Sequence, residues 1–313
     1  IFVILQRVCQ KGSNMNMLQD RHAYLIMAYD RFELLDKLLK MIDDERNDIY
    51  IHIDKKSGDV PYEKIRSSLA HSDIFFLDRK DIRWGSYSLI ECELDLLKQA
   101  VKRKYMYYHL ISGVDLPIKT QDYIHDFFEK NAGKEFIHVE HTDRNNIRWL
   151  CERYHFFAGR QGREKKGFYV GLEKISLGIQ KLFHVNRLRN EKNMALWKGS
   201  NWFSITNQFA EYVVSREKWI KKHFRYTRTC DEVFLQTILA NSEFKDNLFY
   251  QKNDDNYIAN MRYIDWNRGK PYVFREGDLE ELKRVPHLFA RKFDEKISGG
   301  LIDEVFNYVV NNN

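Results

Sequence analysis

His22-Ala-Tyr-Leu-Ile-Met-Ala-Tyr29 is a continuous apolar run of strand length. Leucine and isoleucine then recur at helical spacing from Leu34 to Ile42, and Asp48 to Ile53 is a second segment of strand character. Between the first run and the helical pattern, Asp30-Arg-Phe-Glu33 resembles a capping box and predicts where the helix begins. A strand, a helix and a strand in this order favour a parallel sheet.

Strands and helices continue to alternate toward the C-terminus. Segment 144–193 is basic and aromatic without a clear periodicity, and we expect it to cover or shape a cleft. We predict an α/β fold, with a doubly wound, mostly parallel central sheet and helices on both faces. The further expected elements are helices over 62–70, 86–102, from Thr120, 208–221 and 231–240, and strands over 72–77, 106–111, 135–139 and 202–206.

The composition indicates a basic chain that can bury a full core. Of its 313 residues 43% are hydrophobic, 14% are aromatic and only four are proline, so we do not expect disorder to dominate. The net charge of +6 suits phosphorylated small molecules, acidic membrane surfaces or nucleic acid. Because the basic clusters at 163–166 and 221–225 lie in separate elements, we interpret them as solvated faces and expect no nucleic-acid partner.

The cysteines bear on the cellular compartment. The chain has four, Cys9, Cys92, Cys151 and Cys230. They lie far apart and form no C-x-x-C pair, which argues against a zinc ribbon or a dense disulfide framework. The chain contains no Asn-x-Ser/Thr sequon, and its opening apolar run, Ile1 to Leu5, is too short for a membrane span or a signal core. We expect a cytoplasmic bacterial protein, in solution or at the inner face of the membrane.

Several side chains are placed to bind a ligand. Ligands of an α/β sheet usually lie beyond the carboxyl ends of its strands, where Met27, Asp54 and the Arg83-Trp84-Gly85 turn would converge. Asp54 could instead cap the next turn, and Trp84 could fill the edge of the sheet rather than stack on a base. Near the C-terminus, Arg291 and Lys292 lie inside an apolar run, which indicates an anion site, although they could also form a solvated helix end.

Two acids begin the predicted helix 231–240. Acids are favoured in a first helical turn by the helix dipole alone. The functional alternative is that Glu232 is a general base, with Asp231 as a competing candidate that fits a capping role better. His138-Val-Glu-His141 could be taken for a metal site, but it has no cysteine cluster beside it, and we interpret it as structural.

These segments, in this order, resemble glycosyltransferase family 14, which comprises the core-2/I-branching N-acetylglucosaminyltransferases and the peptide O-xylosyltransferases. The likeness extends from Ala23 to Asp294. It is carried by five motifs: Ile51-His-Ile-Asp-Lys-Lys56, Gly113-Val-Asp-Leu-Pro-Ile-Lys-Thr120, Gly199-Ser-Asn-Trp-Phe203, Asp231-Glu232 and His287-Leu-Phe-Ala-Arg-Lys-Phe-Asp294.

The resemblance implies a GT-A-type nucleotide-sugar transferase fold and an inverting reaction that turns an α-linked UDP-sugar into a β-glycoside. It also implies that no divalent metal or other cofactor takes part, which agrees with the absence of any Asp-x-Asp pair from the sequence. Basic side chains can neutralise a leaving diphosphate in place of a metal. By this reading residues 1–21 are an N-terminal extension and 22–313 one domain, with a nucleotide-binding half over 22–140 and an acceptor-binding, catalytic half over 141–313.

The resemblance also implies roles for individual residues. Glu232 matches the catalytic base. On the donor side it implies UDP-sugar contacts by Met27, Asp54, Trp84, Arg268, Arg291 and Lys292. On the acceptor side it implies contacts by Arg153, Tyr154, Asn201 and Trp266.

Donor and acceptor are less closely defined. Gly199–Phe203 and Trp266–Arg268 are more similar to the xylosyltransferases, and His287–Asp294 is more similar to the branching enzymes. We expect N-acetylglucosamine to be transferred to a glycan or lipid-linked glycan. We also expect that the protein can associate peripherally with a membrane surface. The alternatives are transfer from UDP-xylose and a non-catalytic module that binds sugar nucleotides or glycans.

Overall fold

The computed structural model describes residues 20–140, 144–160, 167–252 and 256–312. Several features named above lie wholly or partly outside this range: residues 1–19 of the predicted extension with the run Ile1 to Leu5 and Cys9, the basic cluster at 163–166 within segment 144–193, and His141. The other three cysteines are buried and unpaired, as expected for reduced thiols. None of the described helices is both long and apolar enough to cross a membrane.

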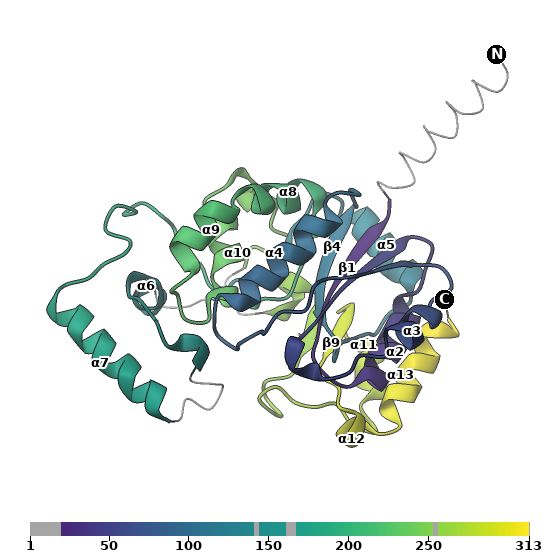
Figure 1. Ribbon diagram of the computed structural model, residues 1–313. Coiled ribbons are helices and arrows are strands. Elements are labelled where there is room, and N and C mark those ends of the chain that lie inside the picture. Colours follow the sequence, from purple (N-terminus) through teal and green to yellow (C-terminus); the bar gives the residue numbers. More distant parts are fainter. Residues whose placement is uncertain (1–19, 141–143, 161–166, 253–255, 313) are drawn as a thin grey trace, which may run out of the picture.

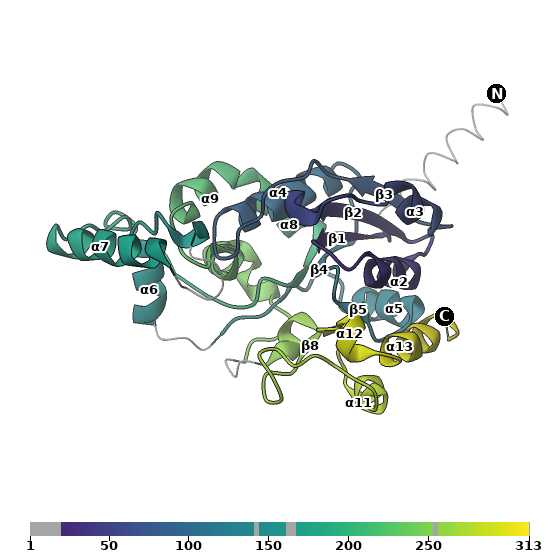
Figure 2. The same ribbon diagram turned by 60° about the horizontal axis from the view of Figure 1, so that its bottom comes forward.

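Six strands form the central sheet in the order β3-β2-β1-β4-β7-β6. The first four run parallel, whereas β7 runs antiparallel to β4, and β6 runs antiparallel to β7. This confirms the predicted α/β fold with a mostly parallel sheet (Figures 1 and 2). The strands are β1 (His22–Ala28), β2 (Asn47–Ile53), β3 (Asp73–Phe76), β4 (Tyr107–Ser112), β6 (Phe136–Ile137) and β7 (Phe203–Thr206).

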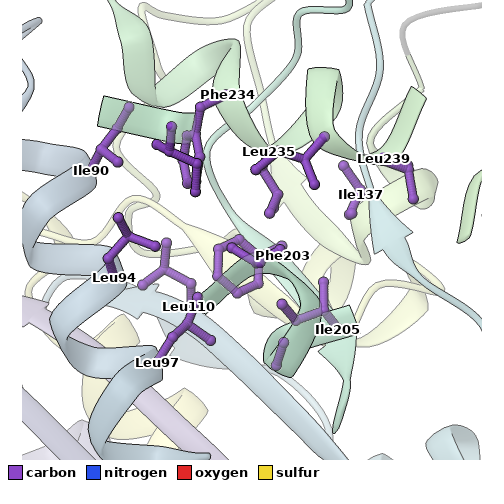
Figure 3. Packing of buried hydrophobic residues seen from close by; sticks show 14 of the residues in the cluster. Ile90, Leu94, Leu97, Leu110, Ile137, Phe203, Ile205, Phe234, Leu235 and Leu239 are labelled. Atoms are coloured by element: carbon purple, nitrogen blue, oxygen red, sulfur yellow. The ribbon is translucent and has the colours of Figure 1, made fainter. Parts of the chain in front are cut away.

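One face of the sheet packs on a first hydrophobic core. Ala23 and Leu25 of β1 lie in this core, and Figure 3 shows Leu94 and Leu97 beside Leu110 of β4 within it. The leucines at 94 and 97 are one helical turn apart, so they meet the sheet from the same side of their helix. The helices over this face are α4 (Ser88–Ala100), α8 (Asn207–Ser215), α9 (Glu217–Phe224) and α10 (Phe234–Ala240).

The opposite face packs on a second core. Tyr24 and Ile26, which alternate with Ala23 and Leu25 along β1, lie in it. Because successive strand side chains point to opposite faces, one apolar run supplies both cores. The helices over this face are α2 (Phe32–Ile42), α3 (Tyr62–Ser67), α5 (Gln121–Lys130), α11 (Leu279–Arg284) and α13 (Leu301–Val310), with the short α12 (Glu295–Ser298) before the last.

Two predicted helices differ from the observed ones. The helix expected over 208–221 is interrupted at Arg216 and forms α8 and α9, because two valines and a serine, residues of lower helix propensity, end the first part. The helix expected over 231–240 begins as a 3₁₀ turn, and α10 starts only at Phe234. The 3₁₀ turns are η1 (Lys55–Ser57), η2 (Ala158–Arg160), η3 (Cys230–Glu232), η4 (Glu243–Asn247) and η5 (Tyr257–Asn260).

The predicted capping box before α2 is wrong. Arg31 precedes the helix in the left-handed region, with φ of 64°, and makes no capping hydrogen bond through its side chain. The amide of Leu34 instead donates to the carboxylate of Glu295, 2.8 Å away. A residue from the far end of the chain therefore satisfies the donor that a local acid was expected to satisfy.

A second, three-stranded sheet escaped prediction from the sequence. It consists of β5 (Leu116–Pro117), β9 (Phe289–Arg291) and β8 (Arg262–Ile264), in that order. Arg262 joins it to the central sheet, because its buried guanidinium donates to Ser204 Oγ at 3.0 Å and to the carbonyl oxygen of Phe203 at 2.7 Å. This contact holds β9, which contains Arg291 of the predicted anion site, against the end of the central sheet.

Residues 138–202, between the paired strands β6 and β7, include an arm that contains α6 (Arg144–Glu152) and α7 (Phe168–Leu182). Figures 1 and 2 show both helices at one side of the molecule, away from the central sheet. The segment without clear periodicity in the sequence is therefore helical in part, and α7 projects from the body.

Candidate active site

A cavity of about 890 Å³ lies where β1 and β4 end. Met27 and Ser112, near the carboxyl ends of these strands, line it. The chain crosses from β1 to β2 on one side and places β4 on the other, and such a switch point is the usual ligand site of an α/β sheet. The other lining residues are Trp84, Leu89, His138, Glu140, Gly199, Ser200, Asn201, Trp202, Asp231, Glu232, Tyr257, Ile264, Trp266, Asn267, Pro271 and Arg291.

The direction of β7 brings distant residues to this cavity. Because β7 is antiparallel to β4, its N-terminal end lies at the same edge of the sheet as the carboxyl end of β4. Residues 199–202, which immediately precede β7, therefore line the cavity together with Met27 and Ser112.

Glu232 lies in this cavity beside a lysine. Its side chain is 36% exposed, and Lys198 Nζ lies 3.3 Å from Glu232 Oε2 and 2.8 Å from Glu140 Oε2. Burial raises the pKa of Glu232, the positive charge of Lys198 opposes this, and the negative charge of Glu140 adds to it. The lysine thus supports an ionised carboxylate that can accept a proton from a hydroxyl group in the cavity.

The lysine itself is held in its charged form. Burial lowers the pKa of Lys198, but the carboxylates of Glu232 and Glu140 outweigh this effect and raise the pKa above its usual value. The amide of Glu140 also donates to the carbonyl oxygen of Lys198 at 2.8 Å. Backbone and side-chain contacts together hold the three charged groups in one arrangement.

Gly199 allows the backbone segments around Glu232 to approach one another. Its amide donates to the carbonyl oxygen of Glu232 at 2.8 Å. A Cβ atom at this position would lie 1.8 Å from the carbonyl oxygen of His138, far inside contact distance. The position therefore requires glycine, and the residue links the 138–140 segment to the 3₁₀ turn that carries the acid.

Two further acids near this site, Glu93 and Asp231, are buried. Among the described residues, both carboxylate oxygens of Glu93 and Oδ1 of Asp231 are buried without a hydrogen-bond partner. Burial raises the pKa of both groups, and the charge of Glu232 raises the pKa of Asp231 further.

Asp231 makes no cap, because the residues preceding the 3₁₀ turn and α10 are Thr229 and Val233, and neither end has a side-chain capping bond. The capping interpretation of Asp231 is therefore wrong.

On the predicted anion side, Arg291 reaches the cavity. Its Nη1 donates to Asp115 Oδ1 and to Ser112 Oγ, each at 2.8 Å, and its guanidinium lies 4.4 Å from the ring centre of Trp202. Lys292, the next residue, does not line the cavity. A phosphate group in the cavity would therefore meet a cation that is already oriented by a carboxylate and an aromatic ring.

Arg268 is occupied by acids. It contacts Asp265 through Nε, Asp278 through Nη1 at 3.1 Å and Glu281 through Nη2 at 2.7 Å. Its neighbours Trp266 and Asn267 line the cavity, but Arg268 does not. To bind a diphosphate it would have to leave three carboxylates.

Of the three residues expected at the uridine end, two line the cavity and one does not. Met27 and Trp84 line the cavity, and Trp84 is 43% exposed, as a stacking surface needs to be. Asp54 does not line it. Its Oδ1 accepts a hydrogen bond from the amide of Lys56 at 2.9 Å, so its carboxylate caps the next turn, the alternative that the sequence allowed.

Of the four predicted acceptor residues, two line the cavity and two do not. Asn201 and Trp266 line the cavity, whereas Arg153 and Tyr154 do not. Tyr154 lies in the arm, where its amide donates to Gln180 of α7 at 2.7 Å. In the described ranges, no group of three or more His, Cys, Asp or Glu residues is arranged to hold a metal ion.

Sequence reasoning missed Glu140 and Lys198. Glu140 belongs to the His138-Val-Glu-His141 pattern, which we interpreted as structural, although His138 and Glu140 both line the cavity. Two signals were available in the sequence. Glu140 follows a predicted strand, and Lys198 comes directly before the Gly199–Phe203 motif.

Comparison with known proteins assigns the family. The sequence model described as Branch: Core-2/I-Branching enzyme matches residues 22–285, most of the chain. The chain belongs to this family. The resemblance and the GT-A-type fold expected from the motifs agree with this assignment, and the match covers the cavity except for Arg291.

Named relatives of this Core-2/I-branching chain include two kinds of transferase. This chain is 25% identical over 310 residues to "Xylosyltransferase 2" of Rattus norvegicus, and the match covers 90% of this chain and 33% of the relative. It is also 25% identical over 302 residues to the human "Beta-1,3-galactosyl-O-glycosyl-glycoprotein beta-1,6-N-acetylglucosaminyltransferase", covering 87% and 65%. The chain therefore spans about one third of the length of the xylosyltransferase.

One solved structure is also similar to this chain. It is the apo crystal structure of mouse Xyloside xylosyltransferase 1, with a TM-score of 0.34 and 10% sequence identity. The similarity covers 86% of this chain and 96% of the other.

Proposed function

We propose that the chain is an inverting glycosyltransferase that moves a sugar from UDP to a hydroxyl of a glycan or lipid-linked glycan. One observation carries the proposal: an acid with a raised pKa, Glu232, and an oriented cation, Arg291, line the same cavity of a Core-2/I-branching family member. A base for the acceptor and a counter-charge for the leaving group are the two parts that such a transfer needs.

In the proposed reaction, Glu232 accepts the proton of the acceptor hydroxyl. The hydroxyl oxygen forms a bond to the anomeric carbon from the face opposite the diphosphate. The bond from that carbon to the diphosphate breaks, and its electron pair leaves on the oxygen of UDP. The charge that develops there faces Arg291, so inversion of an α-linked donor yields a β-glycoside.

We further propose that the reaction needs no divalent metal. Arg291 supports this, because Asp115 and Ser112 hold its guanidinium at the cavity, where it can donate to phosphate oxygens. The side chains of Trp84, Trp202 and Trp266, which also line the cavity, offer flat apolar surfaces for the base and the sugars.

For the donor we favour UDP-N-acetylglucosamine, because the His287–Asp294 motif is more similar to the branching enzymes. UDP-xylose is the second candidate, and the identity to a xylosyltransferase supports it. The test is UDP release from each donor by the full chain with a panel of glycan acceptors, in EDTA and then with manganese. We expect turnover in EDTA with one donor and a β-linked product by NMR. An α-linked product, or activity only with manganese, would contradict the proposal, and UDP binding without turnover would indicate a non-catalytic module.

A further inference from the structure

Helix α7 is oriented with two uncharged or acidic polar side chains, Glu173 and Gln180, toward the protein. Glu173 is buried and accepts hydrogen bonds from His155 Nδ1 at 2.8 Å and from the amide of Phe157 at 3.1 Å. One heptad later, Gln180 is also buried and bonds both the amide and the carbonyl oxygen of Tyr154, at 2.7 and 2.9 Å. These bonds fix which side of the helix faces the protein.

The side turned away from the protein is apolar. The spacing of its large residues, seven, four and three positions apart along the helix, places them on one side. Soluble proteins rarely expose so many large apolar side chains together unless the surface binds something. Each is more than half exposed: Phe168 75%, Ile175 62%, Ile179 53%, Leu182 72%, and Phe183, just after the helix, 72%.

The charges beside this apolar side have one sign. Glu173 is the only acid in α7 and is buried, so the exposed charged residues of the helix are Lys174 and Lys181. An apolar stripe beside basic residues is the pattern of a helix that lies in the headgroup region of a membrane.

We propose that α7 docks the chain on an anionic lipid surface, lying in the plane of the membrane. With 15 residues it is shorter than the roughly 20 needed to span a bilayer. Charge decides between a membrane and a second copy of the chain: two copies meeting through α7 would oppose lysine to lysine with no exposed acid on the helix, whereas anionic headgroups match both lysines. This inference does not depend on the proposed sugar transfer.

The test is flotation of the full chain with vesicles of equal parts phosphatidylcholine and phosphatidylglycerol, and with vesicles of phosphatidylcholine alone. We expect wild-type protein to float with the anionic vesicles, and less of it as salt is raised. The double variant Ile179→Ser/Leu182→Ser should lower the partition coefficient by about tenfold or more. The pair Lys174→Glu/Lys181→Glu should lower binding to anionic vesicles only.

The matched control is Ile297→Ser, an equally conservative change at an exposed isoleucine of α12, which should float like wild type. Circular dichroism and UDP-sugar turnover in vesicle-free solution should stay unchanged in all variants, so failure of docking and failure of sugar transfer are separate results. Equal flotation of wild type and the Ile179→Ser/Leu182→Ser variant would overturn the proposal. So would a wild-type dimer in solution that this variant converts to a monomer without any binding to vesicles.

Discussion

Lys198 Nζ lies 3.3 Å from Glu232 Oε2 and bridges it to Glu140. The carboxylate that would act as a base is therefore paired with a cation, and its proton affinity depends on that partner. Lys198 is the shared counter-charge of the two carboxylates, so its removal would leave two acids side by side.

Removing the lysine should move the pH profile. The charge of Lys198 lowers the pKa of Glu232, so Lys198→Met should raise it. A base works only when it is deprotonated, so activity lost as the pH falls should be lost at a higher pH in this variant. The measurement is kcat/KM against pH, with Lys218→Met on the exposed side of α9 as control. An unshifted acid limb would show that Lys198 does not tune the base, and Lys198→Arg should restore the wild-type profile.

Glu232→Gln should lower turnover about 10²–10⁴-fold, the usual contribution of a general base. Affinity for UDP should hardly change, because glutamine keeps the size of the side chain. Initial rates and calorimetry on one preparation measure both quantities, and Glu211→Gln on α8 serves as the exposed control. If the variant kept more than about a tenth of the wild-type rate, Asp231 would become the next candidate.

Arg291→Ala should weaken binding of UDP by about 1.5–3 kcal/mol, as expected for a hydrogen bond to a charged group, and weaken uridine much less. Arg268→Ala is the matched comparison. Because three carboxylates hold Arg268, we expect its removal to lower the melting temperature and leave UDP affinity nearly unchanged. Isothermal calorimetry in EDTA measures the affinities for UDP and uridine of both variants. The same measurement is made on Lys292→Ala. Equal losses for UDP and uridine in Arg291→Ala would remove Arg291 from the diphosphate site.

Gly199→Ala should disturb the site. The added Cβ would lie 1.8 Å from the carbonyl oxygen of His138, so we expect the free energy of unfolding to fall by roughly 1–3 kcal/mol and activity to be lost. Gly178→Ala in α7 is the control, because nothing lies within 4 Å of its added Cβ, and it should be neutral or stabilising. Urea unfolding of the two variants decides. Wild-type stability of Gly199→Ala would mean that the 138–140 segment can move away.

The central sheet could be predicted because its strands are long apolar runs. β1 and β2 were located to within a residue, since both are buried on two faces and their central residues are mostly large and apolar. The small sheet could not be predicted. β5, β8 and β9 contain two or three residues each, too few to show any periodicity, and only the partner strands define them.

The site could be predicted in part for a related reason. Glu232 and Trp84 were found from local position and from resemblance, and both line the cavity. Glu140 and Lys198 come from opposite ends of the long segment between β6 and β7, so no window of sequence contains both. The ion pairs of Arg268 with Asp278 and Glu281 could not be foreseen, because these partners meet it only after the chain has folded.

β6 and β7 pair directly, with Ile137 opposite Phe203, although residues 138–202 separate them. The long segment is thus a closed loop whose two ends are already held by the sheet. Each doubling of the length of such a loop costs only about 0.6 kcal/mol. Insertions or deletions at its tip would leave the strand pairing, Glu140 and Lys198 in place. The part of the arm around α7 could therefore be exchanged, whereas Ile147, Cys151 and Leu188 of the same segment pack in the first core and would have to be kept.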